Sequence, residues 1–279
     1  MDVSKVAESI QSMKVQGAKE IALYSLKFLR KFCKKYGFGL KFEVAAMILE
    51  RARPTAVVLH NCLEILKKKR SVKTIDYLIK RLETSTRRIA NIGSKLIVNG
   101  HTIMTHCHSG EALAVLKNAW KKGKNFHVFA TITEPLEQGV KTAKELSKIG
   151  VPVTLITDNA VSYFMKDIDC VVVGADAIRV VEPKGVVNKI GTKNLALAAA
   201  REKKPFIVVG NTLKIDKRKK LVIEERPAQE IYAEIFSKIN TKKIKVRNPA
   251  FDLVEFDLVS YLVNEKGIFT PKEFMKRFG

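Results

Sequence analysis

The apolar positions in the first third of the chain recur at helical spacing. One stripe runs from Val3 to Met13 and a second from Ala22 to Cys33. An amphipathic helix buries a residue every three to four positions, whereas a half-buried strand alternates at every second position. Short β-branched runs are missing from this part of the chain. Residues 1–92 are therefore predicted to form a helical N-terminal domain.

The pattern changes after Gly93. Short continuous apolar runs, each a predicted strand, now appear at Thr102–Thr105, Phe126–Thr133, Val151–Thr157, Cys170–Gly174 and Phe206–Gly210. Helical stretches lie between them, at Glu111–Lys122, Val140–Ile149 and Leu195–Glu202. Buried strands that alternate with helices indicate a parallel sheet covered on both faces. We therefore predict an α/β fold in which residues 93–279 form a doubly wound parallel-sheet domain.

Composition narrows the class of protein. The chain has 279 residues, of which 46% are hydrophobic, enough to build sizeable cores. No apolar run reaches the roughly 18 residues that a membrane span needs, and the N-terminus lacks the apolar core of a secretion signal. The four cysteines follow no disulfide or metal-binding spacing. We expect a cytoplasmic protein with reduced thiols.

The charge is strongly positive and unevenly placed. The net charge is +23; residues 1–100 carry 21 basic and 8 acidic side chains, while residues 101–176 carry 8 of each. Basic flanks fit nucleic acid or a phosphorylated small molecule as partner. No RNA-binding, zinc-finger or helix-turn-helix motif is present. A solvated lysine-rich surface is the simplest interpretation, and nucleic acid is not expected to be the main ligand.

Chemistry is expected where strands end, because ligands of open α/β sheets bind at the carboxyl ends of the strands. Cys107 follows the run Thr102–Thr105 and precedes a predicted helix. The positive end of that helix would favour a thiolate and make the sulfur a base or nucleophile. A buried structural cysteine is the alternative. A zinc site with His106 and His108 is disfavoured because no fourth ligand is evident.

Two further segments carry candidate chemistry. Asp176 ends the apolar run Val171–Gly174, and partial burial there would raise its pKa towards that of a general acid; capping of the next turn is the alternative. The segment Gly185–Thr192 leads into a helix, and Lys189 supplies a charge suited to phosphate.

Taken together, these segments resemble one family. It contains archaeal ribose-1,5-bisphosphate isomerases, methylthioribose-1-phosphate isomerases and the α, β and δ subunits of translation initiation factor 2B. The similar segments span nearly the whole chain: Gly17-Ala18, Arg53–Val57, Thr105–Ser109, Gln138-Gly139, Gly174–Ile178, Asn188–Thr192 and Asn248–Asp252. The resemblance implies a helical domain followed by a Rossmann-like domain.

The resemblance also implies a reaction. Cys107 would remove the proton from C2 of the sugar, and Asp176 would act as the acid in ring opening and proton transfer, without a metal or a redox cofactor. Regulatory subunits generally lack this pair, so its presence favours an enzyme. Ala177 stands where methylthioribose-phosphate isomerases usually carry Arg, which favours the ribose-1,5-bisphosphate branch, whose step links nucleotide breakdown to RuBisCO in archaea. A non-catalytic regulatory subunit that binds a sugar phosphate or nucleotide is the alternative.

The binding residues implied by the resemblance are Gln16, Gly17, Ala18, Arg53, Ser109, Gly110, Glu111, Gln138, Asn188, Lys189 and Lys214. Arg53 could otherwise cap a helix, and Lys214 could be solvated. The chain departs from the family at three positions. Gln16 and Glu134 stand where family enzymes carry Arg, and Ile132 stands where they carry Glu. A carboxylate at 134 would repel phosphate, so Lys141, Lys184 or Lys193 would have to compensate. A homodimer or an assembly of dimers is implied, with AMP as a possible effector.

Overall fold

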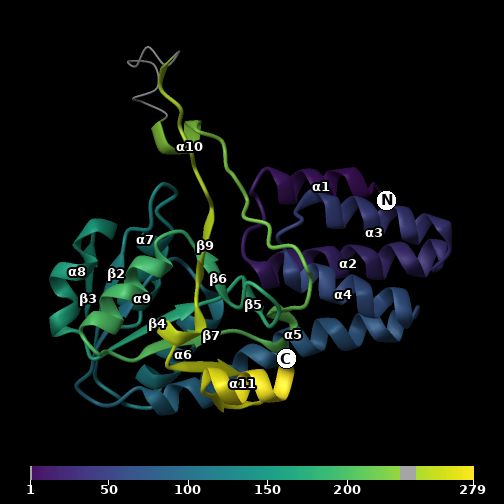
Figure 1. Cartoon of the computed structure of the whole chain (residues 1–279). Helices are drawn as coiled ribbons and strands as arrows, with labels where there is room; N and C mark the ends of the chain where they lie inside the picture. Colours follow the sequence, from purple (N-terminus) through teal and green to yellow (C-terminus); the bar gives the residue numbers. More distant parts are fainter. Residues whose placement is uncertain (1, 233–242) are drawn as a thin grey trace.

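The computed structural model describes residues 2–232 and 243–279. Its first part consists of five helices: α1 Val3–Gln11, α2 Ala18–Tyr36, α3 Leu40–Ala52, α4 Val57–Lys68 and α5 Val72–Gly93. Their apolar stripes meet in one core, in which Ile10, Leu26 and Leu63 are fully buried. Figure 1 shows these helices lying together beside the sheets. The predicted helical N-terminal region is confirmed.

The main sheet has seven strands in the order β11-β10-β7-β4-β1-β2-β3. Their bounds are β1 Thr102–Thr105, β2 His127–Thr131, β3 Val153–Ile156, β4 Cys170–Gly174, β7 Phe206–Val209, β10 Tyr261–Asn264 and β11 Gly267–Phe269. All neighbouring pairs are parallel except β10 and β11. The five predicted strands are present, and the sequence analysis missed the hairpin of β10 and β11.

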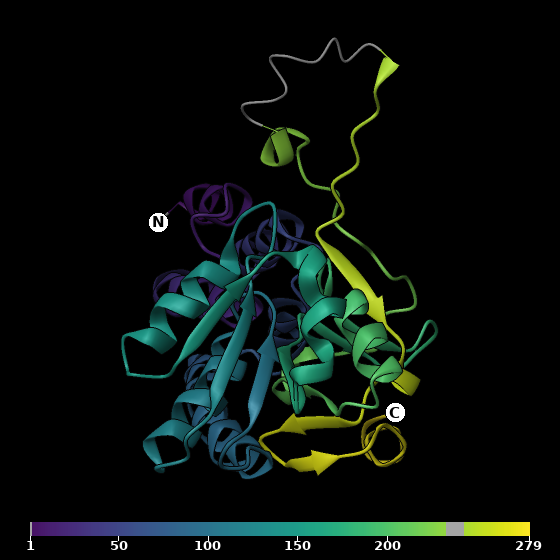
Figure 2. The same cartoon turned by 90° about the vertical axis from the view of Figure 1, so that its left-hand side faces the viewer.

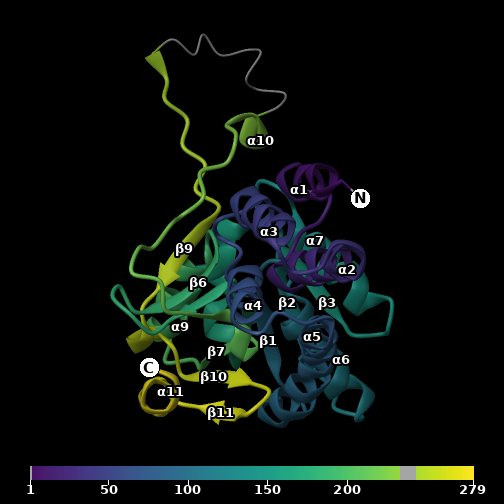
Figure 3. The ribbon, with the colours of Figure 1, turned by 90° about the vertical axis from the view of Figure 1, so that its right-hand side faces the viewer.

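Helices cover both faces of this sheet. On one face, α5, α6 (Gly110–Lys121) and α7 (Gln138–Ser147) contribute Ile89, Leu116 and Leu146 to a shared core. On the other face, α8 (Val161–Phe164), α9 (Thr192–Arg201) and α11 (Pro271–Phe278) pack on the strands. Figure 3 shows α5 and α6 on one side of the strands and α9 and α11 on the other. The predicted doubly wound α/β architecture is confirmed.

A second, four-stranded sheet has the order β8-β5-β6-β9. Its strands are β5 Ala177–Arg179, β6 Gly185–Lys189, β8 Ile215–Asp216 and β9 Phe251–Val254. Strand β6 is antiparallel to β5 and β9. The sequence analysis treated Gly185–Thr192 only as a lead into a helix. Its first five residues form the buried strand β6, which carries Asn188 and Lys189 to the start of α9.

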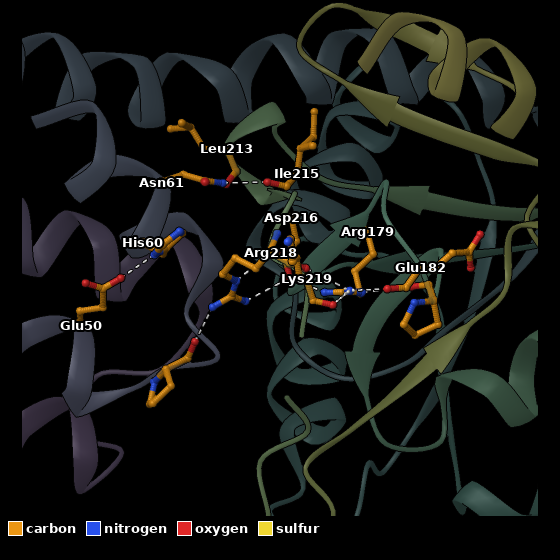
Figure 4. Close-up of polar contacts among 12 residues, drawn as sticks. Glu50, His60, Asn61, Arg179, Glu182, Leu213, Ile215, Asp216, Arg218 and Lys219 are labelled. Carbon is orange, nitrogen blue, oxygen red and sulfur yellow. Dashed lines mark hydrogen bonds and ion pairs between the residues drawn. The ribbon is translucent and has the colours of Figure 1, made fainter. Parts of the chain in front are cut away.

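The helical region is joined to the sheets by polar contacts (Figure 4). The side-chain amide of Asn61 on α4 donates to the carbonyl oxygens of Leu213 and Ile215, both at 2.8 Å. The guanidinium of Arg218 donates to the carbonyl oxygen of Pro54 at 2.7 Å. These bonds fix the loop before α4 against the strand β8, and that placement matters for the site described next.

An arm projects from the body between β8 and β9. Figures 1 and 2 show two extended segments leading away from the sheets, one of them ending in the short helix α10, Gln229–Tyr232. At its base, Glu225 and Pro249 form an isolated antiparallel bridge. Among the residues that the structure describes, no helix is long and apolar enough to cross a membrane.

Candidate active site

A cavity of about 690 Å³ opens where the helical region meets the ends of strands β1, β4 and β6. A small recess of about 50 Å³ adjoins it. The sequence-predicted residues that line the cavity are Gln16, Gly17, Arg53, Cys107, Gly110, Gln138, Asp176 and Lys189. Those that line only the recess are Ala18, Ser109, Glu111, Asn188 and Lys214. The fold thus brings together residues from all parts of the chain, while their roles stay predictions.

Cys107 lies in the tight loop between β1 and α6. Its φ of 64° is left-handed, a conformation that non-glycine residues rarely adopt. Two threonines hold this backbone: the amide of Cys107 donates to Thr133 Oγ1 at 2.8 Å, and Thr142 Oγ1 donates to the carbonyl oxygen of Cys107 at 2.9 Å. The loop is therefore held from the segment that follows β2 and from α7, and Cys107 lines the cavity.

The structure does not favour the thiolate that the sequence analysis expected at Cys107. Burial raises the pKa of the Cys107 thiol to about 11, although the charge of Lys189 and the backbone amide of His108 act in the opposite direction. Desolvation disfavours the charged form, and here it outweighs the opposing effects of Lys189 and the His108 amide. A thiol with a pKa of about 11 is mostly protonated at neutral pH, and its thiolate is a strong base.

Asp176 follows β4 and faces the same cavity. Burial raises the pKa of its carboxyl, and the cations Lys214, Arg53 and Lys189 only partly oppose this effect. The direction agrees with the prediction. The preceding Gly174 is needed for packing, because a Cβ there would lie 2.3 Å from Ser109 Oγ. A raised pKa favours the protonated carboxyl that acid catalysis requires.

A buried ion pair forms the wall of the recess. Lys214 Nζ lies 2.6 Å from Glu111 Oε2, and both residues are buried. The other oxygen of Glu111 accepts from the side-chain amide of Asn211 at 2.7 Å. Burial lowers the pKa of Lys214, but the charge of Glu111 outweighs it, so the pKa lies above its usual value. Lys214 is thus a fixed cation and not the solvated side chain of the alternative.

Lys189 and Asn188 come from the end of β6. Both are buried, and Asn188 donates to Thr192 Oγ1 at 3.0 Å. Thr192 in turn donates to the carbonyl oxygen of Lys189 at 2.5 Å. The Asn-Lys-Ile-Gly-Thr segment is therefore a local turn that holds Lys189 at the cavity wall, where a cation can meet a phosphate group.

Two helices begin at the recess. Ser109 caps α6, accepting from the amide of Ala112 at 3.3 Å, and Gly110 is the first residue of that helix. Gly17, with a φ of 85°, precedes α2 and provides no side-chain cap. Within the described residues, the amides of Ala18, Lys19 and Glu20 at the start of α2 have no hydrogen-bond acceptor, while the amide of Ile21 donates to the carbonyl oxygen of Gly17 at 3.0 Å. Free amides at a helix N-terminus bind anions.

Arg53 lies at the end of α3, where its guanidinium is within 3.2 Å of Glu224 Oε2. Thr55 donates to the same oxygen at 3.0 Å. Arg53 is thus held at the cavity by the arm segment. Gln16 is exposed at the rim and donates to the carbonyl oxygen of Met13 at 3.1 Å. The Oε1 atom of Gln138 is buried without a partner among the described residues, so it is free to accept from a ligand.

The two histidines beside Cys107 point to separate partners. His106 is buried between Thr131 Oγ1 at 2.7 Å and the carbonyl oxygen of Ile190 at 2.8 Å. His108 contacts Thr142 Oγ1 at 2.9 Å. Within residues 2–232 and 243–279, no group of three or more His, Cys, Asp or Glu residues is arranged to hold a metal ion. Both histidines therefore build the loop around the thiol.

Glu134 is exposed and lies outside the lining of the cavity and of the recess, and the effect of its carboxylate on phosphate binding stays a prediction. Of the three lysines expected to compensate, only Lys141 lines the cavity; Lys184 pairs with Glu182, and Lys193 pairs with Glu255.

Sequence reasoning missed several charged residues of the cavity: Lys14, Glu20, Glu137 and Arg226. Arg226 comes from the base of the arm and lies 3.0 Å from Glu224. Arg226 reaches the cavity only because the arm packs back against the body there, and no pattern in the nearby sequence predicts that packing. Lys14 shares its loop with Gln16, and that proximity is a signal that could have found it.

Comparisons with known proteins identify the family of the chain. The model of the initiation factor 2 subunit family matches residues 14–271. The ribose 1,5-bisphosphate isomerase of Archaeoglobus fulgidus is 40% identical over 288 residues, which cover 97% of this chain and 90% of that protein. The methylthioribose-1-phosphate isomerase of Acetivibrio thermocellus is 37% identical over 303 residues, with 96% and 88% covered.

A solved structure is similar in fold. The crystal structure of the Pyrococcus horikoshii OT3 translation initiation factor eIF-2B superposes with a TM-score of 0.85, covering 96% of this chain and 97% of that one. Its sequence identity of 24% makes it evidence for the fold alone.

Proposed function

This chain belongs to the initiation factor 2 subunit family and is an isomerase, and we propose that its reaction converts ribose 1,5-bisphosphate to ribulose 1,5-bisphosphate. The observation that carries the proposal is the shared cavity of Cys107 and Asp176. The full-length similarity to ribose 1,5-bisphosphate isomerases supports a sugar phosphate as the substrate class.

The charges of the cavity support a doubly phosphorylated substrate. Five basic residues line it, namely Lys14, Arg53, Lys141, Lys189 and Arg226, against the three acids Glu20, Glu137 and Asp176. Lys214 adds a buried cation at the recess. Two phosphate groups at opposite ends of a five-carbon sugar can reach cations of both the helical and the sheet part of the site.

The mechanism divides proton transfer between two residues. Asp176, as the acid, gives its proton to the ring oxygen as the bond from that oxygen to C1 breaks; its burial, which raises the pKa of the carboxyl, favours this role. Cys107, as thiolate, removes the proton from C2, and the electron pair forms the C1–C2 double bond. Cys107 then returns the proton to C1, while the Asp176 carboxylate takes the proton of the C2 hydroxyl, which leaves a ketone. Both residues end as they began, and no electrons leave the substrate.

The test is a coupled assay of purified protein with ribose 1,5-bisphosphate, with and without AMP, in which RuBisCO carboxylation detects the product. Turnover is expected, with a loss of at least about 10³-fold in Cys107→Ser and in Asp176→Asn. Circular dichroism of both variants must match that of the wild type. Wild-type-like rates in both variants would refute the assignment.

The same assay with 5-methylthioribose 1-phosphate separates the two branches of enzymes. Ribose 1,5-bisphosphate is expected to have the higher kcat/KM, because the second phosphate meets the additional cations. If the folded protein turns over neither sugar, the regulatory subunit becomes the better hypothesis. A homodimer or an assembly of dimers is expected from the family resemblance, and light scattering measures it.

A further inference from the structure

One acidic side chain of the cavity stands where a phosphate group would be expected. Glu20 is in the first turn of α2 and lines both the cavity and the recess. A Cβ added at Gly17 would lie 2.5 Å from Glu20 Oε2, and one added at Gly110 would lie 3.7 Å from Glu20 Oε1. The carboxylate therefore lies between the first residues of α2 and α6.

This position is built for an anion. The N-termini of α2 and α6 converge there, each with the positive end of its helix dipole, and the amides of Ala18 and Lys19 have no acceptor among the described residues. Lys214, at the back of the recess, is a fixed cation. A carboxylate and a phosphate oxygen make the same kinds of contact with amides and ammonium groups.

Glu20 is not held in place by a counterion. Within the described residues it forms no ion pair, and its side chain is exposed to the cavity. Its charge nevertheless interacts with residues of the site, because it acts to raise the pKa values of His108 and Lys214. The side chain thus acts on these groups while it stays exposed to solvent.

We propose that Glu20 is a specificity-determining residue whose carboxylate competes with phosphate for the subsite at the N-termini of α2 and α6. This inference rests on the proposed function, because it assigns that subsite to a phosphate of the substrate. The phosphate must displace the carboxylate, and the two charges repel each other until the side chain has turned towards solvent. Glu20 therefore weakens the binding of any anion, and of small anions most, since they make no other contacts.

The experiment measures binding and not turnover, so that it does not depend on the identity of the substrate. Isothermal titration calorimetry measures the Kd of inorganic phosphate for the wild type and for Glu20→Gln. This variant keeps the shape of the side chain and removes its charge. The Kd is expected to fall about tenfold, and the difference to shrink at high salt. Glu20→Ala, which also removes the polar atoms, is expected to bind phosphate as tightly as Glu20→Gln.

Glu134→Gln is the matched control, because it changes the net charge equally at an exposed position outside the cavity. Its Kd is expected to stay within about twofold of the wild-type value. An equal gain in both Gln variants would show a general charge effect and overturn the proposal, as would weaker phosphate binding in Glu20→Gln. Tighter phosphate binding by Glu20→Gln without turnover of ribose 1,5-bisphosphate would uphold the subsite and refute the proposed reaction.

Discussion

The ammonium group of Lys214 lies 2.6 Å from the carboxylate of Glu111, and both side chains are almost completely enclosed. Removal of one partner from such a pair leaves a buried charge without compensation. Lys214→Met is therefore expected to lower the free energy of unfolding by about 3–5 kcal/mol, as measured by urea denaturation.

Lys193→Met is the control for this prediction. Lys193 also pairs with a carboxylate, that of Glu255 at 2.6 Å, but both side chains are well exposed to solvent. Its loss is expected to cost no more than about 1 kcal/mol. Equal losses in the two variants would contradict the role assigned to burial.

The reactivity of Cys107 is expected to follow its raised pKa. Because the thiol has a pKa of about 11, the thiolate fraction grows about tenfold per pH unit through neutral and alkaline pH. The rate of alkylation by iodoacetamide should rise accordingly and level off only near pH 11. Mass spectrometry should find the label on Cys107, since Cys33, Cys62 and Cys170 are buried. A rate that levels off near pH 7 would show that the helix terminus outweighs burial.

Asp158 is expected to act as a positioning residue for the thiol. Its two oxygens accept from the backbone amides of Thr133 at 2.9 Å and Glu134 at 2.7 Å. Thr133 in turn holds the amide of Cys107. Asp158→Ala should lower kcat about 10²-fold with little change in KM, because displacement of a reacting group slows chemistry more than it weakens binding. Partial recovery in Asp158→Asn, which keeps one acceptor oxygen, would support positioning.

Asp167→Ala is the control for that series, because Asp167 is exposed on the same part of the chain. It should leave kcat unchanged. If KM rises in Asp158→Ala while kcat is preserved, the residue serves binding and the prediction fails.

Asp216 is expected to make stability depend on acidic pH. It lies 3.1 Å from the fully buried Arg179 and also pairs with Arg218 (Figure 4). Burial raises the pKa of its carboxyl, but hydrogen bonds from Arg218 and the charges of both arginines outweigh it, so the pKa is below its usual value of 3.8. A lowered pKa in the folded state means that the pair stabilises the fold above pH 3.8 and that this contribution is lost as the pH falls further.

Asp216→Asn should therefore cost about 3–5 kcal/mol at pH 7, because it leaves Arg179 buried and unpaired. The difference from the wild type should shrink in urea titrations below pH 4. Glu182→Gln, at an exposed ion pair with Lys184, should change stability by less than about 0.5 kcal/mol at either pH. A pH-independent difference for Asp216→Asn would contradict the assigned charge state.

Much of the site was predictable from the sequence, because the helices and strands that carry its residues follow from local sequence patterns. Helical and continuous apolar patterns report which parts of an element are buried, so the helical region and five of the seven strands of the main sheet were found. Parallel strands bring their carboxyl ends to one edge of a sheet, so Cys107 after β1 and Asp176 after β4 were expected to meet. Both line one cavity.

The tertiary structure alone decided how the charges act. Burial, which depends on what packs over a residue, set the direction of the Cys107 pKa shift. Position 134 lies beside the motif in sequence, yet it is not among the residues that line the cavity, while Arg226 enters it from a distant arm. Local spacing cannot foresee these neighbours, because electrostatic interactions act through space between segments whose distance is determined only when the whole chain has packed.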